Sequence, residues 1–234
     1  MEGIFELMSE ITPMRVIAHI RNDFTEKFGI PRQSGLVDST RATIVFEPEY
    51  RIPEAFRGLD GYSHLWLIWQ FSEAVRKEWS PTVRPPRLGG NKRMGVFATR
   101  SPFRPNPIGL SSVRITGIDL HTPKGPLLHV AGADLLDGTP IYDIKPYLPY
   151  TDSHSDAIGG FGFTSGEGAV DVRISEELLA KIPEDLREST LALLREDPRP
   201  GYQNDPTRVY YMAYADFEIG FVVDGDTLTV IEIK

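Results

Sequence analysis

The amino-acid sequence predicts a mainly antiparallel β-domain followed by a small α/β unit. From residue 14 to residue 150, short runs rich in β-branched and aromatic residues alternate with glycines, prolines and charged turns. No amphipathic helix of about 12 residues separates these runs. The strand–helix alternation of a doubly wound fold is therefore absent, and a closed or sandwiched sheet is expected.

Six segments of the N-terminal part are expected to form strands. Each combines β-forming residues with a turn signal at its end. They are RVIAHIR (15–21), RATIVFE (41–47), HLWLIWQF (64–71), MGVFAT (94–99), SSVRITGI (111–118) and PLLHVAGA (126–133).

The composition changes after residue 152. Five glycines lie between Gly159 and Gly168, and no Lys or Arg occurs from residue 152 to residue 168. Such a segment is typical of a linker or a mobile loop. We therefore predict an N-terminal domain at 1–152, a glycine-rich linker at 153–168 and a C-terminal domain at 169–234.

The C-terminal domain is expected to begin with a strand, VDVRI (170–174), and a helix. Ser175 is suited to cap that helix, with two glutamates in the first turn, and Pro183 should end it. A second helical segment carries leucines at helical spacing. Two strands, 208–223 and 227–233, then flank Asp224-Gly225, a two-residue hairpin signal.

The overall composition is typical of a soluble globular protein. The chain has 234 residues, of which 41% are hydrophobic and 25% charged, and it contains no Cys. The lack of Cys excludes disulfides, thiolate nucleophiles and Cys-based zinc sites. The acidic N-terminus does not resemble a signal peptide, and the longest apolar run, 65–69, is too short to cross a bilayer. A cytoplasmic protein is expected.

One segment is strongly basic although the chain is acidic. Between Pro81 and Arg114 there are seven basic residues, six prolines and no Asp or Glu, whereas the net charge of the whole chain is −8. Such a segment suits an anionic partner such as phosphate or nucleic acid, and its prolines reduce the entropy lost on binding. A solvated basic loop without a ligand is the alternative. The basic residues are Arg84, Arg87, Lys92, Arg93, Arg100, Arg104 and Arg114.

The remaining motifs leave alternatives open. The five histidines show no ligand spacing, so no metal site is predicted. Arg32 and Gln33 follow a proline in a loop and suit a carboxylate, an adenine edge or ordinary loop capping. The segment 132–152 is expected to be rich in turns. If part of it is a strand, Asp143 and Lys145 face the same side, where they can pair or meet a ligand.

The sequence contains four long and unusual motifs: FGIPRQSGL, GLDGYSHLWLI, TVRPPRLGGNKRMGVFATRSPFRPNPIGLS and GADLLDGTPIYDIKPYLPY. They resemble the TrmO family of S-adenosylmethionine-dependent tRNA adenine-N(6)-methyltransferases. The tail from residue 192 is similar to the additional C-terminal domain of bacterial members. The resemblance implies a single-sheeted β-barrel, a homodimer and methylation of threonylcarbamoyl-adenosine beside the anticodon of tRNA.

The resemblance also implies which residues contact S-adenosylmethionine. The family carries these contacts on loops that this sequence retains, although many members have His where this chain has Ser72. The implied cofactor residues are Pro31, Arg32, Gln33, Ser72, Glu73, Arg100, Leu110, Ala131, Gly132, Ala133 and Asp134.

The chemistry implied by the resemblance needs few catalytic groups. Methyl transfer from a sulfonium depends largely on positioning, but the poorly nucleophilic target nitrogen benefits from a proton acceptor. Asp143, with Lys145 beside it, is the candidate. Arginines of the basic segment suit the threonyl carboxylate and the phosphates of the anticodon arm. A non-catalytic RNA-binding module and a hydrolase or lyase acting on a small nucleotide are the alternatives.

Overall fold

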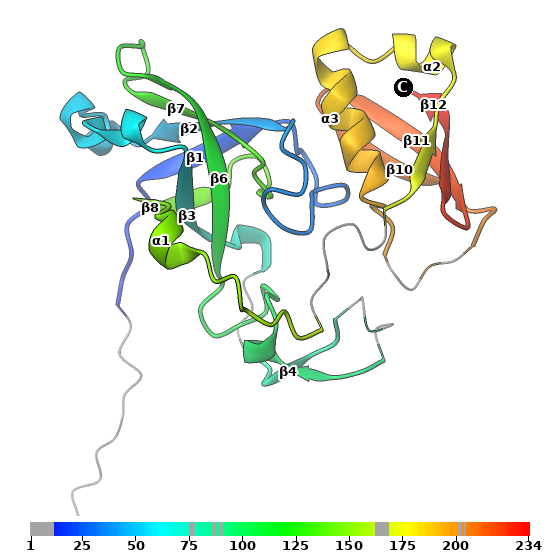
Figure 1. The fold of residues 1–234 in the computed structure, drawn as a ribbon, viewed down its shortest axis with the longest axis horizontal. Coiled ribbons are helices and arrows are strands. Elements are labelled where there is room, and N and C mark those ends of the chain that lie inside the picture. The colour runs from blue at the N-terminus through cyan, green and yellow to red at the C-terminus, as the bar shows by residue number, and fades with distance from the viewer. Residues whose placement is uncertain are drawn as a thin grey trace, which may run out of the picture.

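A closed β-barrel and a smaller α/β domain make up the protein in the computed structural model (Figure 1). The structure describes residues 12–74, 78–85, 88, 91–161, 169–200, 203 and 205–234. Arg87 of the basic segment, two glycines of the LGGN turn and residues 162–168 of the expected linker lie outside these residues. The prediction of a single closed sheet followed by an α/β unit is confirmed.

The barrel consists of six antiparallel strands in the order β1-β2-β7-β6-β3-β8. Strand β8 closes it by pairing with both β3 and β1. The strands are β1 (Ala18–Asn22), β2 (Arg41–Phe46), β3 (His64–Gln70), β6 (Ile108–Asp119), β7 (Leu127–Ala131) and β8 (Pro140–Pro146).

Residues 132–152, which were expected to be rich in turns, also contain the strand β8, which was not among the expected strands. Its prolines occupy the first and last positions of the strand, where a missing N–H interrupts the ladder least. The helix α1 (Pro149–Asp152) follows it. The expected strand at 94–99 was also too long: only β5 (Met94–Gly95) pairs, with β4 (Thr82–Val83), and a 3-10 turn at Val96–Ala98 follows.

Alternation of buried and exposed residues gives the barrel its core. Along β3, Leu65, Leu67 and Trp69 point inward, while the intervening residues are only partly buried. These side chains pack with inward residues of every other barrel strand, such as Ile20 and Leu128. Three short 3-10 helices, Pro48–Tyr50, Pro53–Phe56 and Leu59–Gly61, connect β2 to β3.

The C-terminal domain packs helices against a four-stranded sheet of order β10-β11-β12-β9. The Ser175 hydroxyl accepts a hydrogen bond from Leu178 N at 3.2 Å, which confirms the predicted helix cap. The domain contains β9 (Asp171–Arg173), α2 (Glu176–Ala180), α3 (Glu184–Arg195), β10 (Tyr210–Tyr214), β11 (Phe217–Asp224) and β12 (Thr227–Ile233).

The single strand expected at 208–223 was wrong, because it is a hairpin of β10 and β11. Its turn includes Ala215 with a φ of 51°, a conformation that the sequence does not indicate because Ala rarely adopts it. The second hairpin is confirmed, and its two loop residues are Gly225 and Asp226. Within the described ranges, no helix has both the length and the apolar character needed to cross a membrane.

We predict that Gly109→Ala destabilises the barrel by about 1–3 kcal/mol, as overpacking of a filled interior does. A Cβ at Gly109 would lie 2.2 Å from the Trp69 indole on the adjacent strand. Urea unfolding of Gly109→Ala and Gly95→Ala tests this. Gly95 has a φ of −57° and open space around it, so it is the matched control. Equal stability of the two variants would contradict the packing argument.

Candidate functional site

A carboxylate shortly after β7, that of Asp134, is held by a chain of hydrogen bonds that begins inside the barrel. Trp69 Nε1 donates to Ser111 Oγ at 2.9 Å, and Ser111 Oγ donates to Asp134 Oδ1 at 2.5 Å. Ser111 is completely buried. Burial raises the pKa of Asp134, while hydrogen bonds from Ser111 and from backbone N–H groups, and the charge of Arg100, oppose the rise. Asp134 is therefore a desolvated carboxylate with a cation nearby.

The loop between β1 and β2 lies against this carboxylate. The Gln33 side-chain oxygen accepts a hydrogen bond from Arg100 Nη1. Ser34 Oγ accepts one from Ser112 N at 3.1 Å, and Gly35 N donates to Gly132 O at 2.9 Å. The fold thus brings together Gln33, Arg100 and Asp134, which the sequence places on three separate loops.

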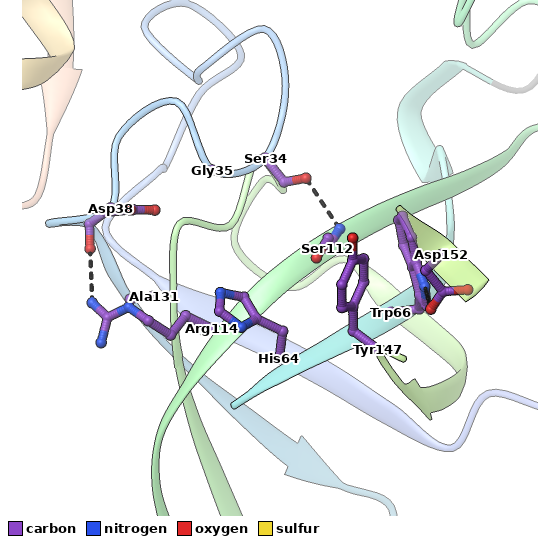
Figure 2. A pocket seen from close by; sticks show the side chains of 10 residues that line it. All are labelled: Ser34, Gly35, Asp38, His64, Trp66, Ser112, Arg114, Ala131, Tyr147 and Asp152. Atoms are coloured by element: carbon purple, nitrogen blue, oxygen red, sulfur yellow. Dashed lines mark hydrogen bonds between the residues drawn. The ribbon is translucent and has the colours of Figure 1, made fainter. Parts of the chain in front are cut away.

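Beside this cluster is a cavity of about 470 Å³ on the outer surface of the barrel (Figure 2). Ser34 contributes to both, because it lines the cavity and its backbone N–H hydrogen-bonds to Asp134. The cavity is lined by Ser34, Gly35, Asp38, His64, Trp66, Ser112, Arg114, Ala131, Tyr147 and Asp152.

Aromatic side chains form one wall of the cavity (Figure 2). The Tyr147 ring centroid lies 5.5 Å from that of Trp66 and 6.2 Å from that of His64. Trp66 Nε1 donates to Asp152 Oδ2 at 2.8 Å, which fixes the indole. Hydrogen bonds from Leu148 N and from Trp66 lower the pKa of Asp152. The cavity therefore offers several aromatic rings, tilted against one another, with a carboxylate at its edge.

Strand pairing places further polar residues on this outer face. Side chains paired across adjacent antiparallel strands lie on the same side of a sheet. On β6, Leu110, Ser112 and Arg114 alternate outward and are paired with Ile68, Trp66 and His64 of β3. On its other side, β3 pairs Ile68 with Asp143 and Trp66 with Lys145 of β8.

The predicted catalytic pair thus lies on the strand next to the aromatic wall. Lys145 Nζ is 3.0 Å from Asp143 Oδ2, which confirms that the two side chains share a face and can pair. Ile144 N donates to Asp143 Oδ1 at 2.9 Å. Both side chains remain solvent-accessible.

The other residues expected to contact a cofactor have different surroundings. Ala131 lines the cavity, Gly132 has a φ of 77°, and Ala133 belongs to the barrel core. Leu110 is 54% exposed on the outer face. Ser72 and Glu73 lie in a 3-10 turn (Ser72–Ala74), where Glu73 pairs with Lys27 at 3.1 Å.

Pro31 and Arg32 lie at the seam between the two domains. Both line a smaller cavity of about 120 Å³ together with Leu193 and Asp197 of the C-terminal domain. Arg32 Nη2 donates to the carbonyl oxygens of Asp197 at 2.9 Å and Arg199 at 3.1 Å.

The basic segment extends from the barrel around the β4–β5 hairpin. Arg84, Lys92 and Arg93 are exposed there, and Arg93 Nη1 hydrogen-bonds Thr82 Oγ1 at 3.3 Å. Arg104 instead donates to Thr99 O at 2.7 Å and supports the loop that carries Arg100. The segment therefore combines solvent-facing cations with structural ones.

Sequence analysis missed Ser34, Trp66 and Ser112 as site residues. The alternation of 64–70 and 108–114 could have placed Trp66 and Ser112 on one outward face, but the pairing register was needed to align them.

Within the part of the chain that the structure describes, no group of three or more His, Cys, Asp or Glu side chains is arranged to hold a metal ion.

The closed antiparallel barrel, the cluster of Gln33, Arg100 and Asp134, and the aromatic cavity together define a β-barrel domain with a candidate polar ligand site on its loops. The tRNA-methyltransferase O N-terminal domain model matches residues 19–153, and the TrmO C-terminal domain model matches residues 168–234. The chain belongs to the tRNA-methyltransferase O family.

Relatives and solved structures agree with this assignment. A tRNA (adenine(37)-N6)-methyltransferase of Escherichia coli K12 is 40% identical over 226 residues, which cover 93% of this chain and 96% of the relative. Its counterpart in Eikenella corrodens is 46% identical over 164 residues, 70% of this chain and 92% of the relative. A crystal structure of TrmO from Pseudomonas aeruginosa superimposes with a TM-score of 0.76 at 33% identity, covering 96% of this chain and 100% of that one.

We predict that Asp134→Asn stabilises the unliganded protein at about pH 7 and not at about pH 3. The folded-state pKa of Asp134 lies above its unfolded value. At a pH above both of these pKa values, the charged carboxylate therefore destabilises the folded protein. The effect vanishes at a pH where Asp134 is protonated in the folded and the unfolded protein alike. Urea unfolding at both pH values measures it, with exposed Asp60→Asn as the control. A variant less stable than the wild type at neutral pH would refute this account.

Proposed function

We propose that this protein transfers a methyl group from S-adenosylmethionine to the exocyclic nitrogen of threonylcarbamoyl-adenosine, next to the anticodon of a tRNA. The observation that carries the proposal is the juxtaposition of the Asp134–Arg100–Gln33 cluster with the aromatic cavity, through Ser34. The names of the Escherichia coli and Eikenella corrodens relatives support the same reaction class.

The residues of the cluster fit S-adenosylmethionine, which supplies an electrophilic methyl group on a sulfonium. This ligand carries a carboxylate, an ammonium, ribose hydroxyls and a positive sulfur. Arg100 can pair with its carboxylate, and the desolvated Asp134 carboxylate can accept from its ammonium or hydroxyls. A Pyrococcus abyssi relative, 37% identical over 138 residues (59% of this chain, 69% of the relative), is described as a probable S-adenosyl-L-methionine-binding protein.

The cavity beside the cluster is proposed to receive the modified adenosine. Its volume of about 470 Å³ lies in the range of small-ligand sites. The rings of Trp66 and Tyr147 can stack on a purine, as aromatic side chains do with unpaired bases. Arg114 lines the cavity away from Trp66 (Figure 2) and can pair with the threonyl carboxylate.

Catalysis is proposed to rest on positioning and on one proton acceptor. The target nitrogen is a poor nucleophile because its lone pair is delocalised into the purine and the carbamoyl group. Asp143 is proposed to accept its proton, directly or through water, as the new bond forms. Lys145, at 3.0 Å, orients this carboxylate.

The exposed cations of the β4–β5 hairpin are proposed to bind phosphates of the anticodon arm.

We further propose a cytoplasmic homodimer with two-fold symmetry. The exposed apolar residues Ile108 and Leu110, on the face of β6 next to the site, support a subunit contact there.

The decisive test is incubation with S-adenosylmethionine labelled in the methyl group and with tRNA that carries or lacks the threonylcarbamoyl group. Digestion should recover label in N(6)-methylated threonylcarbamoyl-adenosine from the modified tRNA alone. Arg114→Gln should lower kcat/KM for this tRNA by about tenfold or more, the loss expected for a charged hydrogen bond. Binding of tRNA without binding of S-adenosylmethionine would favour a non-catalytic RNA-binding module instead.

We predict that Arg84→Gln, Lys92→Gln and Arg93→Gln each reduce the salt dependence of tRNA binding. The slope of log K against log salt should fall by roughly 0.7–0.9 for each phosphate that the variant no longer neutralises. Salt titrations measure it, with exposed Lys124→Gln, in the turn between β6 and β7, as the control. Slopes that match the wild type in all three variants would mean that the segment is only solvated.

A further inference from the structure

The loop between β1 and β2 belongs to both domains of the protein. It leaves the barrel after Asn22 and returns at Arg41. Its residues Phe24 and Val37 are buried in the hydrophobic core of the C-terminal domain, where Phe28 and Ile30 also pack. The barrel core includes none of these four side chains among the described residues. The C-terminal domain therefore folds around a segment of the N-terminal half.

Close backbone contacts fix the loop on β10 and its turn. Ala215 N donates to Asp23 O at 3.0 Å, and Ala213 N donates to Glu26 Oε1 at 3.2 Å. At Gly29, with a φ of 95°, an added Cβ would lie 2.5 Å from the Met212 side chain. Only glycine tolerates both this conformation and this approach.

The hydrogen bonds of Arg32 to the carbonyl oxygens of Asp197 and Arg199, here called the clamp, attach the loop to the end of α3. The chain after this helix turns at Asp197, which has a φ of 45° and whose N–H caps Leu194 O. The Asp197 carboxylate holds Arg199 by two hydrogen bonds of 2.8 Å, and both side chains are largely buried. This fixes the carbonyl oxygens of Asp197 and Arg199, at the negative end of the helix dipole, where both accept from Arg32.

The two residues immediately after Arg32 are part of the candidate cofactor cluster or contact it. Gln33 bonds Arg100, and Ser34 contacts Asp134 and Ser112. We propose that the C-terminal domain holds this loop in its ligand-binding conformation, with Arg32 as a positioning residue that connects the loop to the end of α3. This inference rests on the proposed binding of S-adenosylmethionine at the cluster.

The test is a double-mutant cycle in the full-length protein with Arg32→Ala and Asp197→Ala. Each change should raise the Kd for S-adenosylmethionine by about tenfold, the cost of losing charged hydrogen bonds. Arg32→Ala removes the donor, and Asp197→Ala removes the carboxylate that holds Arg199 and so fixes the two acceptor carbonyl oxygens. The double variant should be little worse than either single one, because both changes weaken the same contact. KM for S-adenosylmethionine should rise while kcat at saturation stays near the wild type. Lys234→Gln, in an exposed pair of the same domain, is the control.

Hydrogen exchange of residues 33–35 without ligand gives a readout that does not depend on cofactor binding. Both variants should speed this exchange while the barrel strands keep their protection. A raised Kd in Arg32→Ala alone, with Asp197→Ala like the wild type, would overturn the inference in favour of direct cofactor contact. Unchanged exchange in both variants would overturn it as well. If the wild type binds no S-adenosylmethionine, the proposed function fails, and the exchange data still decide the role of the clamp.

Discussion

The desolvated Asp134 carboxylate is the constraint on which the site depends. A buried charge must be satisfied, and here Ser111 and Trp69 provide a hydrogen-bond chain from within the barrel, while Arg100 provides a nearby positive charge. The loop at Gln33 and Ser34 completes the arrangement from outside. The residues around Asp134 come from different elements. The site therefore exists only when the barrel is closed and the loop between β1 and β2 is packed against it.

The two domains meet where this loop is held. Its side chains Phe24 and Val37 are buried in the C-terminal core, while its polar residues Gln33 and Ser34 face the barrel. Two adjacent residues, Arg32 and Gln33, therefore connect the end of α3 to the candidate cofactor cluster. None of the described residues of the C-terminal domain lines the aromatic cavity, yet this domain can thereby influence ligand binding.

Much of the fold could be predicted from the sequence, because strands 41–46, 64–70 and 127–131 follow from β-branched and aromatic runs ended by turns. Strand β8 was missed because its prolines and charges imitate a turn. Only the family resemblance predicted that Gln33, Arg100 and Asp134 share one site, because contacts between distant loops leave no local signal in the sequence. The aromatic wall was missed because it depends on the register of β3, β6 and β8.

The most direct test of the account is the position of the reactive methyl group. S-adenosylmethionine carrying a ¹³C-labelled methyl, bound to the protein, allows nuclear Overhauser contacts from that methyl to be observed. The account predicts contacts to Leu110 and Ser112, on the outer face of β6 beside the cavity. Contacts to Leu193 or Phe28, in the smaller cavity between the domains, would contradict it.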